Sequence, residues 1–229
     1  MKRIKATDMY SKSFRALFSA TRLLFTNKRA LLLILMTYAG LLTASYLFIS
    51  TREATISQLL VTFLSIAAAP ALFFVLQAVS VSYTSGSLRR VAIVSFKLFI
   101  VSLPVIALTA FAAYRVNVTT LRYLLVAVVG PLLAIQLWIA TSNSGLRSIV
   151  KRLGQVLTRT FAPHSVLVYA CGFLIFAVAP YLLLRKSIST ERAWLEISLL
   201  TVRLAASATL MLVGWVTTVG AISILSRDD

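Results

Sequence analysis

The sequence predicts an all-α integral membrane protein with six transmembrane helices. Of its 229 residues, 59% are hydrophobic and only 13% are charged, whereas a soluble domain carries about 25% charged residues. The apolar residues form six runs of the length that crosses a bilayer, about 20 residues each. The net charge is +17, but the basic residues flank the apolar runs. This distribution favours anionic lipid headgroups over nucleic acid as the partner of the basic side chains.

The six apolar runs are continuous, whereas strands of a membrane barrel alternate and are about ten residues long. Helices are therefore expected, within one polytopic domain that covers residues 1–229. The sixth run is long enough to tilt or to project beyond the bilayer. We expect spans at 30–49, 58–80, 91–114, 121–141, 165–184 and 195–225.

The distribution of basic residues predicts the orientation. Of the 23 lysines and arginines, sixteen lie before the first run, in or beside the second and fourth connections, or at the C-terminus. Six lie in the other connections, and Arg203 lies within the sixth run. Cytoplasmic segments carry the excess of Lys and Arg. Both termini are therefore expected in the cytoplasm.

Two segments on the cytoplasmic side, 10–27 and 145–162, are amphipathic at helical spacing. In the first, Phe14, Phe18 and Phe25 share one face. Such helices lie in the headgroup layer, so the segments serve either as anchors on anionic lipid or as docking helices for a partner. The basic residues expected on the membrane surface or on a partner are Lys12, Arg15, Arg22, Lys28, Arg29, Arg147, Lys151, Arg152 and Arg159.

The residues needed for catalysis or for a metal site are scarce. The chain has six acidic residues, none in the middle of a predicted span, and His164 and Cys171 are its sole histidine and cysteine. General acid–base catalysis needs a positioned titratable group, and a metal site usually needs three or four ligands. We therefore expect no enzyme activity, no cofactor and no metal site.

Three polar residues lie in the predicted spans, where a polar or charged side chain costs free energy. Arg203 could pair with Glu196, seven residues earlier on about the same helical face, could extend to the outer surface, or could contact a substrate or partner. Gln136, in the fourth span, is a candidate for a hydrogen bond between helices.

Four spans contain a proline, which removes a backbone donor and tends to kink a helix. They are Pro70, Pro104, Pro131 and Pro180. The pair Gly214 and Thr218 has the spacing of small residues that lets helices approach closely. These features indicate either ordinary close packing or the hinges of a moving transporter.

Three stretches carry a resemblance to known proteins. They are SFRALFSATRLLFTNKRALLLI (Ser13–Ile34), GPLLAIQLWIATSNSGLRSIVKRLGQVLTRTF (Gly130–Phe161) and GWVTTVGAISILSRDD (Gly214–Asp229). They resemble a group of six-helix bacterial membrane proteins that includes the membrane domain ahead of some glycerophosphodiester phosphodiesterases. The resemblance implies a bacterial cytoplasmic membrane. In that family a separate soluble domain performs catalysis, so no catalytic residue is carried over.

A second resemblance rests on the sequence Thr26-Asn27-Lys28-Arg29, which ends the first amphipathic segment. It is similar to the opening of six-helix permease subunits of ABC exporters. This resemblance implies a separate ATPase and a cytoplasmic coupling helix, for which residues 145–163 could serve. Against it, the cytoplasmic connections contain no acidic residue to pair with an ATPase.

Two functions remain the main hypotheses. The first is a non-catalytic subunit or scaffold that packs against other membrane proteins, which predicts a dry bundle with apolar outer faces. The alternative is a permease subunit or small transporter, which predicts a polar cavity around Gln136 and Arg203. A lipid-handling or stress-related membrane factor is a third possibility.

Overall fold

The protein is a multi-pass helical membrane protein. The computed structural model describes residues 6–52, 55–85, 88, 90–143, 153–185 and 192–228, and this part of the chain contains no strand. Six helical stretches are long and apolar enough to cross a bilayer, and they agree with the six predicted spans. They are Lys28–Ser50, Ile56–Ser85, Val91–Arg115, Thr119–Ser142, Pro163–Arg185 and Ala193–Arg227.

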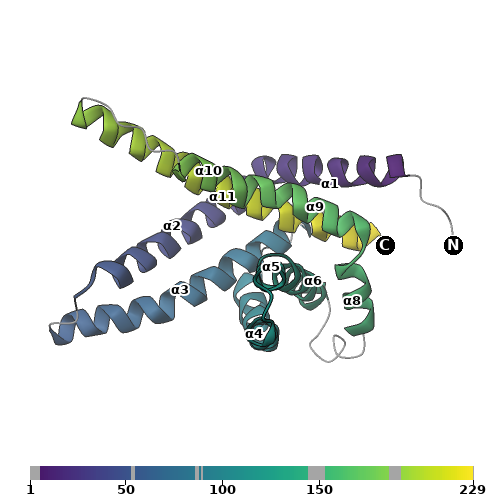
Figure 1. Ribbon diagram of the computed structural model, residues 1–229, viewed down its shortest axis with the longest axis horizontal. Helices are drawn as coiled ribbons and strands as arrows, with labels where there is room; N and C mark the ends of the chain where they lie inside the picture. Colours follow the sequence, from purple (N-terminus) through teal and green to yellow (C-terminus); the bar gives the residue numbers. More distant parts are fainter. Residues whose placement is uncertain are drawn as a thin grey trace.

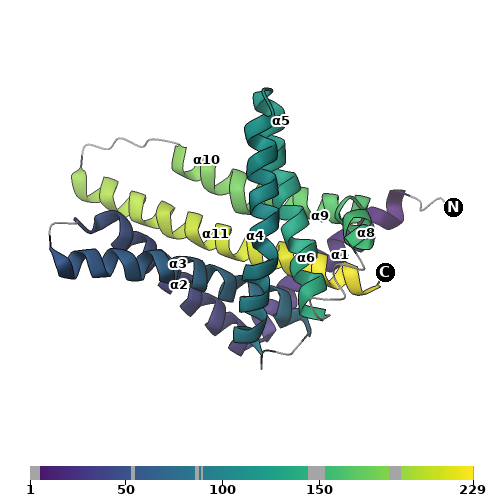
Figure 2. The same ribbon diagram turned by 90° about the horizontal axis from the view of Figure 1, so that it is seen from below.

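The spans form three helical hairpins that diverge from a common base (Figures 1 and 2). The first hairpin pairs α2 (Lys28–Ser50) with α3 (Ile56–Ser82), which ends in the 3-10 turn η1 (Tyr83–Ser85). The second pairs α4 (Val91–Arg115) with a helix made of α5 (Thr119–Leu124), the π-helical turn η2 (Leu125–Val129) and α6 (Gly130–Asn143).

The third hairpin pairs a composite helix with the long helix α11 (Ala193–Asp228). The composite helix consists of α9 (Pro163–Phe173), the π-helical turn η3 (Leu174–Val178) and α10 (Ala179–Arg185). Two further helices lie at the base. They are α1 (Ala6–Thr26), which packs on α9 and α11, and α8 (Leu153–Thr160), which packs on α6.

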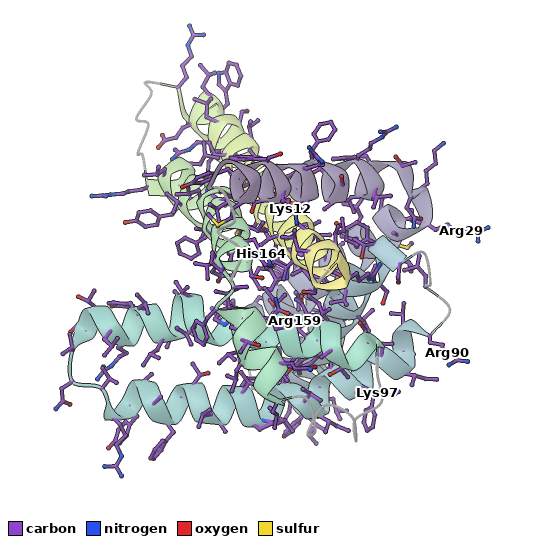
Figure 3. All side chains as sticks on the ribbon, turned by 90° about the vertical axis from the view of Figure 1, so that its right-hand side faces the viewer. Lys12, Arg29, Arg90, Lys97, Arg159 and His164 are labelled. Atoms are coloured by element: carbon purple, nitrogen blue, oxygen red, sulfur yellow. The ribbon has the colours of Figure 1, made fainter. Side chains whose placement is uncertain are left out.

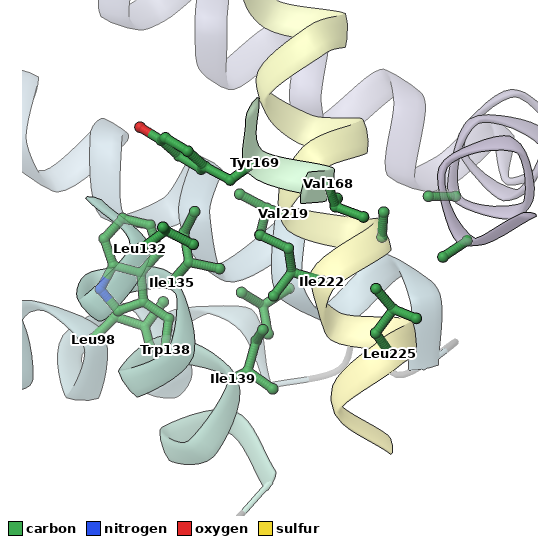
Figure 4. Packing of buried hydrophobic residues seen from close by; sticks show 14 of the residues in the cluster. Leu98, Leu132, Ile135, Trp138, Ile139, Val168, Tyr169, Val219, Ile222 and Leu225 are labelled. Atoms are coloured by element: carbon green, nitrogen blue, oxygen red, sulfur yellow. The ribbon is translucent and has the colours of Figure 1, made fainter. Parts of the chain in front are cut away.

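The hydrophobic core occupies the base, whereas the outer parts of the hairpins are exposed. Side chains are buried from Leu76 to Tyr83 in the first hairpin, and from Val216 to Ile222 in α11. Figure 4 shows this core, in which Ile135, Val168, Val219 and Ile222 meet. Toward the hairpin tips, large apolar side chains face outward, including Leu64, which is 68% exposed. Each hairpin therefore projects as an arm whose outer part has mainly its own partner helix to pack against.

Several basic residues lie at the base (Figure 3). Lys12, Arg29, Arg90 and Arg159 all have exposed side chains there. The C-terminal end of α11 and the N-terminal end of α1 also lie on this side of the molecule (Figure 1). The fold thus brings the segments that were predicted to be cytoplasmic to one end.

Helix α1 packs on the rest of the protein through a face of mostly small residues. Its buried residues are Ser13, Ala16, Ala20 and Leu24. The phenylalanines at 14, 18 and 25 are instead 59%, 72% and 57% exposed. Small side chains let α1 approach α9 and α11 closely. A search of the sequence for large apolar residues does not identify this face. The phenylalanines form an exposed stripe beside the basic face.

Glycine permits the close crossing of α9 and α11. A Cβ atom on Gly172 would lie 2.8 Å from the Cβ of Thr218 and would overlap its hydroxyl. The Thr218 Cβ is fixed to the helix backbone, so the two helices would have to separate. Gly214 also lies at this crossing, where a Cβ would be 3.0 Å from the Phe176 backbone nitrogen.

We predict that Gly172→Ala destabilises the protein by about 1–3 kcal/mol, the usual cost of overpacking. The matched control is Gly154→Ala, because a Cβ at Gly154 meets no atom within 4 Å. This control should leave stability unchanged or raise it by up to about 1 kcal/mol, since alanine favours helix more than glycine does. Thermal unfolding in detergent measures both, and equal unfolding temperatures for the two variants would contradict the close crossing.

The predicted orientation can be tested by cysteine labelling in a Cys171→Ala background. Ser11→Cys lies on α1 at the base, and Thr119→Cys lies at the tip of the second hairpin; both positions are exposed. A membrane-impermeant maleimide should label Thr119→Cys in intact cells and Ser11→Cys only after permeabilisation. Labelling of Ser11→Cys in intact cells would show that the predicted orientation is wrong.

Candidate functional site

Six aromatic rings from all three hairpins meet above the core, and we call them the aromatic hub. Trp138 and Trp215 are at its centre, with ring centroids 6.5 Å apart in an edge-to-face arrangement. Edge-to-face pairs of this kind contribute about 0.5–1.5 kcal/mol beyond the area that they bury. The hub therefore joins the three hairpins. Its members are Phe73 and Phe74 of α3, Phe99 of α4, Trp138 of α6, Phe176 of η3 and Trp215 of α11.

Both hub tryptophans donate hydrogen bonds to residues of a neighbouring helix. Trp138 Nε1 donates to Ser102 Oγ at 2.7 Å, and Trp215 Nε1 donates to Gln77 Oε1 at 2.8 Å. Gln77 and Ser102 are 1% and 2% exposed. Sequence analysis did not identify these two acceptors. The available signal was that an indole N–H inside a membrane needs a partner.

A third hydrogen bond between helices satisfies a backbone carbonyl that a proline leaves without its helical donor. Pro131 has no N–H, so the carbonyl of Ala127, four residues earlier, lacks its usual helical donor. Tyr169 of the third hairpin supplies one, because its hydroxyl donates to the Ala127 carbonyl at 2.6 Å. This carbonyl belongs to the π-helical turn η2. The bond ties the second hairpin to the third at the break in helical geometry that the proline creates.

A central cavity of about 590 Å³ lies between the hairpins on the outer side of the hub. Its floor includes the buried residues Phe74, Gln77 and Trp138, and its mouth includes Ile106 and Val126, which are 57% and 53% exposed. Other lining residues are Tyr38 and Leu41 of α2, Val105, Thr109 and Ala110 of α4, Gly130, Pro131 and Ala134 of the α5–α6 helix, and Met211, Leu212 and Trp215 of α11.

The walls of the central cavity are almost wholly apolar. Gln77, Ser102 and the two indole N–H groups are already bonded to one another in pairs. Apolar cavities stay free of water. The site is therefore suited to an apolar occupant.

Gln136 joins three helices at the base and does not reach the central cavity. Its Nε2 donates to Ser165 Oγ of α9 at 3.4 Å, and its Oε1 accepts from Ser226 Oγ of α11 at 3.3 Å. The side chain is 3% exposed. Gln136, which was expected to bond between helices, thus does so through both its amide nitrogen and its amide oxygen.

Arg203 is not paired with Glu196, which is an exposed residue in the first turn of α11. Two nitrogens of the Arg203 guanidinium, Nε and Nη2, instead donate to the Leu183 carbonyl of α10. The last carbonyls of a helix lack helical donors and form the negative end of its dipole. The Leu183 carbonyl on the neighbouring helix is therefore a closer partner for the guanidinium than Glu196, which lies two turns away on the same helix.

The predicted surface cations that the structure describes lie at the base, away from the central cavity. Lys28 and Arg29 line an open groove beside Thr84 and Ser85, where α2 begins and η1 ends. Arg147, Lys151 and Arg152 lie outside the described residues. The other four of the set, which are all exposed, are Lys12, Arg15, Arg22 and Arg159.

Within the described part of the chain, no three His, Cys, Asp or Glu side chains come together as a metal site would require. Comparison of the chain with protein-family models, with curated proteins and with solved structures gave no match. The fold and the central cavity therefore define a six-helix membrane protein, and its function is inferred from its own geometry.

We predict that Gln77 and Trp215 are energetically coupled. A double-mutant cycle of Gln77→Leu and Trp215→Phe should give a coupling energy of about 0.6–1.7 kcal/mol, the range measured for hydrogen bonds between membrane helices. Unfolding in mixed micelles supplies the four free energies. The control cycle replaces Trp215→Phe by Trp194→Phe, since Trp194 is 62% exposed near the tip of the third hairpin. The control should be additive, and additivity of the Gln77–Trp215 cycle would contradict the coupling.

Proposed function

We propose that this chain is a non-catalytic subunit or scaffold of a membrane protein complex, which it joins through the diverging arms. The observation that carries the proposal is the contrast between base and arms. At the base, the helices bury one another's apolar side chains and form hydrogen bonds between helices. Along the arms, large apolar side chains are exposed on several faces, among them Phe63, Leu64, Leu108 and Leu200, which are 61%, 68%, 65% and 51% exposed.

One arm carries a surface suited to close contact with another helix. On α3, Phe63, Ala67, Pro70 and Ala71 are all exposed, and their spacing places them along one side of the helix. Association of helices in membranes depends on close packing around small residues. We call these four residues the α3 outer face, and we propose that a transmembrane helix of another subunit packs on it.

The exposed aromatic stripe and the cations of the base support attachment to the cytoplasmic membrane surface. Phe14 and Phe18 stand beside the exposed Arg15 and Arg22 on α1. Aromatic rings at the acyl boundary with cations at anionic headgroups are the usual arrangement of an interfacial helix. We propose that α1 both braces the base against α9 and α11 and rests on anionic lipid.

The geometry supports this proposal better than the permease alternative. A permease predicts a polar cavity around Gln136 and Arg203. The two side chains instead bond within the protein, one at the base and the other to α10. The central cavity is lined by other residues and is apolar. A polar substrate would lose its hydration there without gaining hydrogen bonds.

The proposal can be tested with a photoreactive phenylalanine analogue in native membranes. Placed at position 63, on the α3 outer face, the analogue should crosslink this chain to one or a few other polypeptides of defined mass, identified by mass spectrometry. The control is the same analogue at position 74 on the same helix, because Phe74 is only 7% exposed in the hub. It should crosslink this chain to no other polypeptide.

A substitution on the same face makes the test specific. Ala67→Leu should strongly reduce crosslinking from position 63, because a larger side chain holds the partner helix away, whereas Ala67→Gly should preserve it. If position 63 gives only lipid adducts in membranes where the protein is folded, the scaffold proposal is wrong.

A further inference from the structure

We propose that the central cavity binds one acyl chain of a phospholipid, which enters from the leaflet nearer the hairpin tips and ends against the aromatic hub. This site is separate from the α3 outer face and does not depend on the scaffold role. Three properties of the central cavity lead to this ligand: its length, the chemistry of its walls and the position of its mouth.

The length of the cavity matches one leaflet. Along α4 the lining extends from Ser102 to Ala110, and along the facing helix it extends from Val126 to Trp138. At 1.5 Å per residue these walls are about 12 Å and about 18 Å long. The hydrocarbon core of a bilayer is about 30 Å thick, so one leaflet contributes about 15 Å. An extended acyl chain therefore fits between the mouth and the floor.

An acyl chain is thin and flexible, so it can follow the irregular wall that Pro131 and the π-helical turn η2 create.

The walls suit a ligand that forms no hydrogen bonds. The floor groups, Trp138 with Ser102 and Trp215 with Gln77, are already paired. The other polar side chains on the wall, Tyr38 and Thr109, are only partly buried. A polar ligand that displaced lipid from this space would be desolvated without compensation, whereas a hydrocarbon chain regains the dispersion contacts that an empty cavity lacks.

The mouth opens between the arms, on the side away from the base. Ile106 and Val126 are exposed there, whereas Trp138 at the floor is 4% exposed. A lipid of the surrounding leaflet can therefore enter sideways with its headgroup remaining at the surface. The end of the chain then lies against the two hub tryptophans.

This placement can be measured by tryptophan fluorescence, because the chain has only three tryptophans. Trp194→Phe removes the exposed one and leaves Trp138 and Trp215 as reporters. The protein is reconstituted into phosphatidylcholine vesicles in which one acyl chain is brominated near its end. Bromine quenches nearby indoles, so both reporters should be strongly quenched relative to unbrominated vesicles.

Two matched substitutions on α4 separate the cavity from the general lipid surroundings. Ala110 lines the cavity, whereas Ala107 is exposed without lining it. In the Trp194→Phe background, Ala110→Phe should reduce the quenching to about half or less by filling the space, and Ala107→Phe should leave it unchanged. Weak quenching in the parent protein, or equal quenching in the two variants, would overturn the proposal.

A second measurement keeps the test decisive if Ala110→Phe impairs folding. Native mass spectrometry of the parent protein from the same vesicles, after exhaustive delipidation in mild detergent, should show one retained phosphatidylcholine per chain. Absence of a retained lipid would overturn the proposal. So would a polypeptide captured by a photoreactive residue at position 110 in native membranes. Both outcomes leave the α3 outer face untouched, so this proposal and the scaffold proposal can fail separately.

Discussion

Hydrocarbon supplies no hydrogen-bond partners, and this constraint governs the arrangement of the three hairpins. Within each helix the backbone satisfies itself, but indole N–H groups, amides and the carbonyl released by a proline do not. The protein places these groups at one level near the base, where each meets a partner from a neighbouring helix. Trp215 meets Gln77, Trp138 meets Ser102 and Tyr169 meets the Ala127 carbonyl. These bonds fix how the hairpins converge, and the aromatic hub packs around them.

Convergence at one level leaves the outer parts of the hairpins to diverge. Lipid tails are as apolar as leucine, so arms with apolar surfaces gain little by closing on one another. Close approach occurs only where small residues permit it, as at the crossing of Gly172 with Thr218. Toward the tips no comparable contact joins the described parts of the three arms. The central cavity is the space that remains above the hub, and its apolar walls follow from the pairing of the polar groups below.

The sequence predicts the spans well because their signal is local: continuous apolar runs bounded by basic residues. It predicts the hub poorly because the partners are far apart in the chain. Trp215 and Gln77 are separated by 138 residues, and neither residue indicates which helix it faces. The same limit explains Arg203, for which a partner on its own helix could be considered and the Leu183 carbonyl on another could not. For α1, small buried residues carry the packing while large phenylalanines dominate the sequence pattern.

A membrane protein that has satisfied most of its buried polar groups internally retains shape and apolar surface as its means of recognition. Gln136 is an example, since its amide nitrogen and its amide oxygen each form a hydrogen bond with another helix. Arg203, a charged residue well inside the sixth span, donates hydrogen bonds to a carbonyl at the end of α10. The chain therefore separates two environments along its length: cations and an aromatic stripe at the base, and apolar arms around an apolar cavity above the hub. Because the hub lies between them, an occupant of the cavity would contact the residues that join the hairpins.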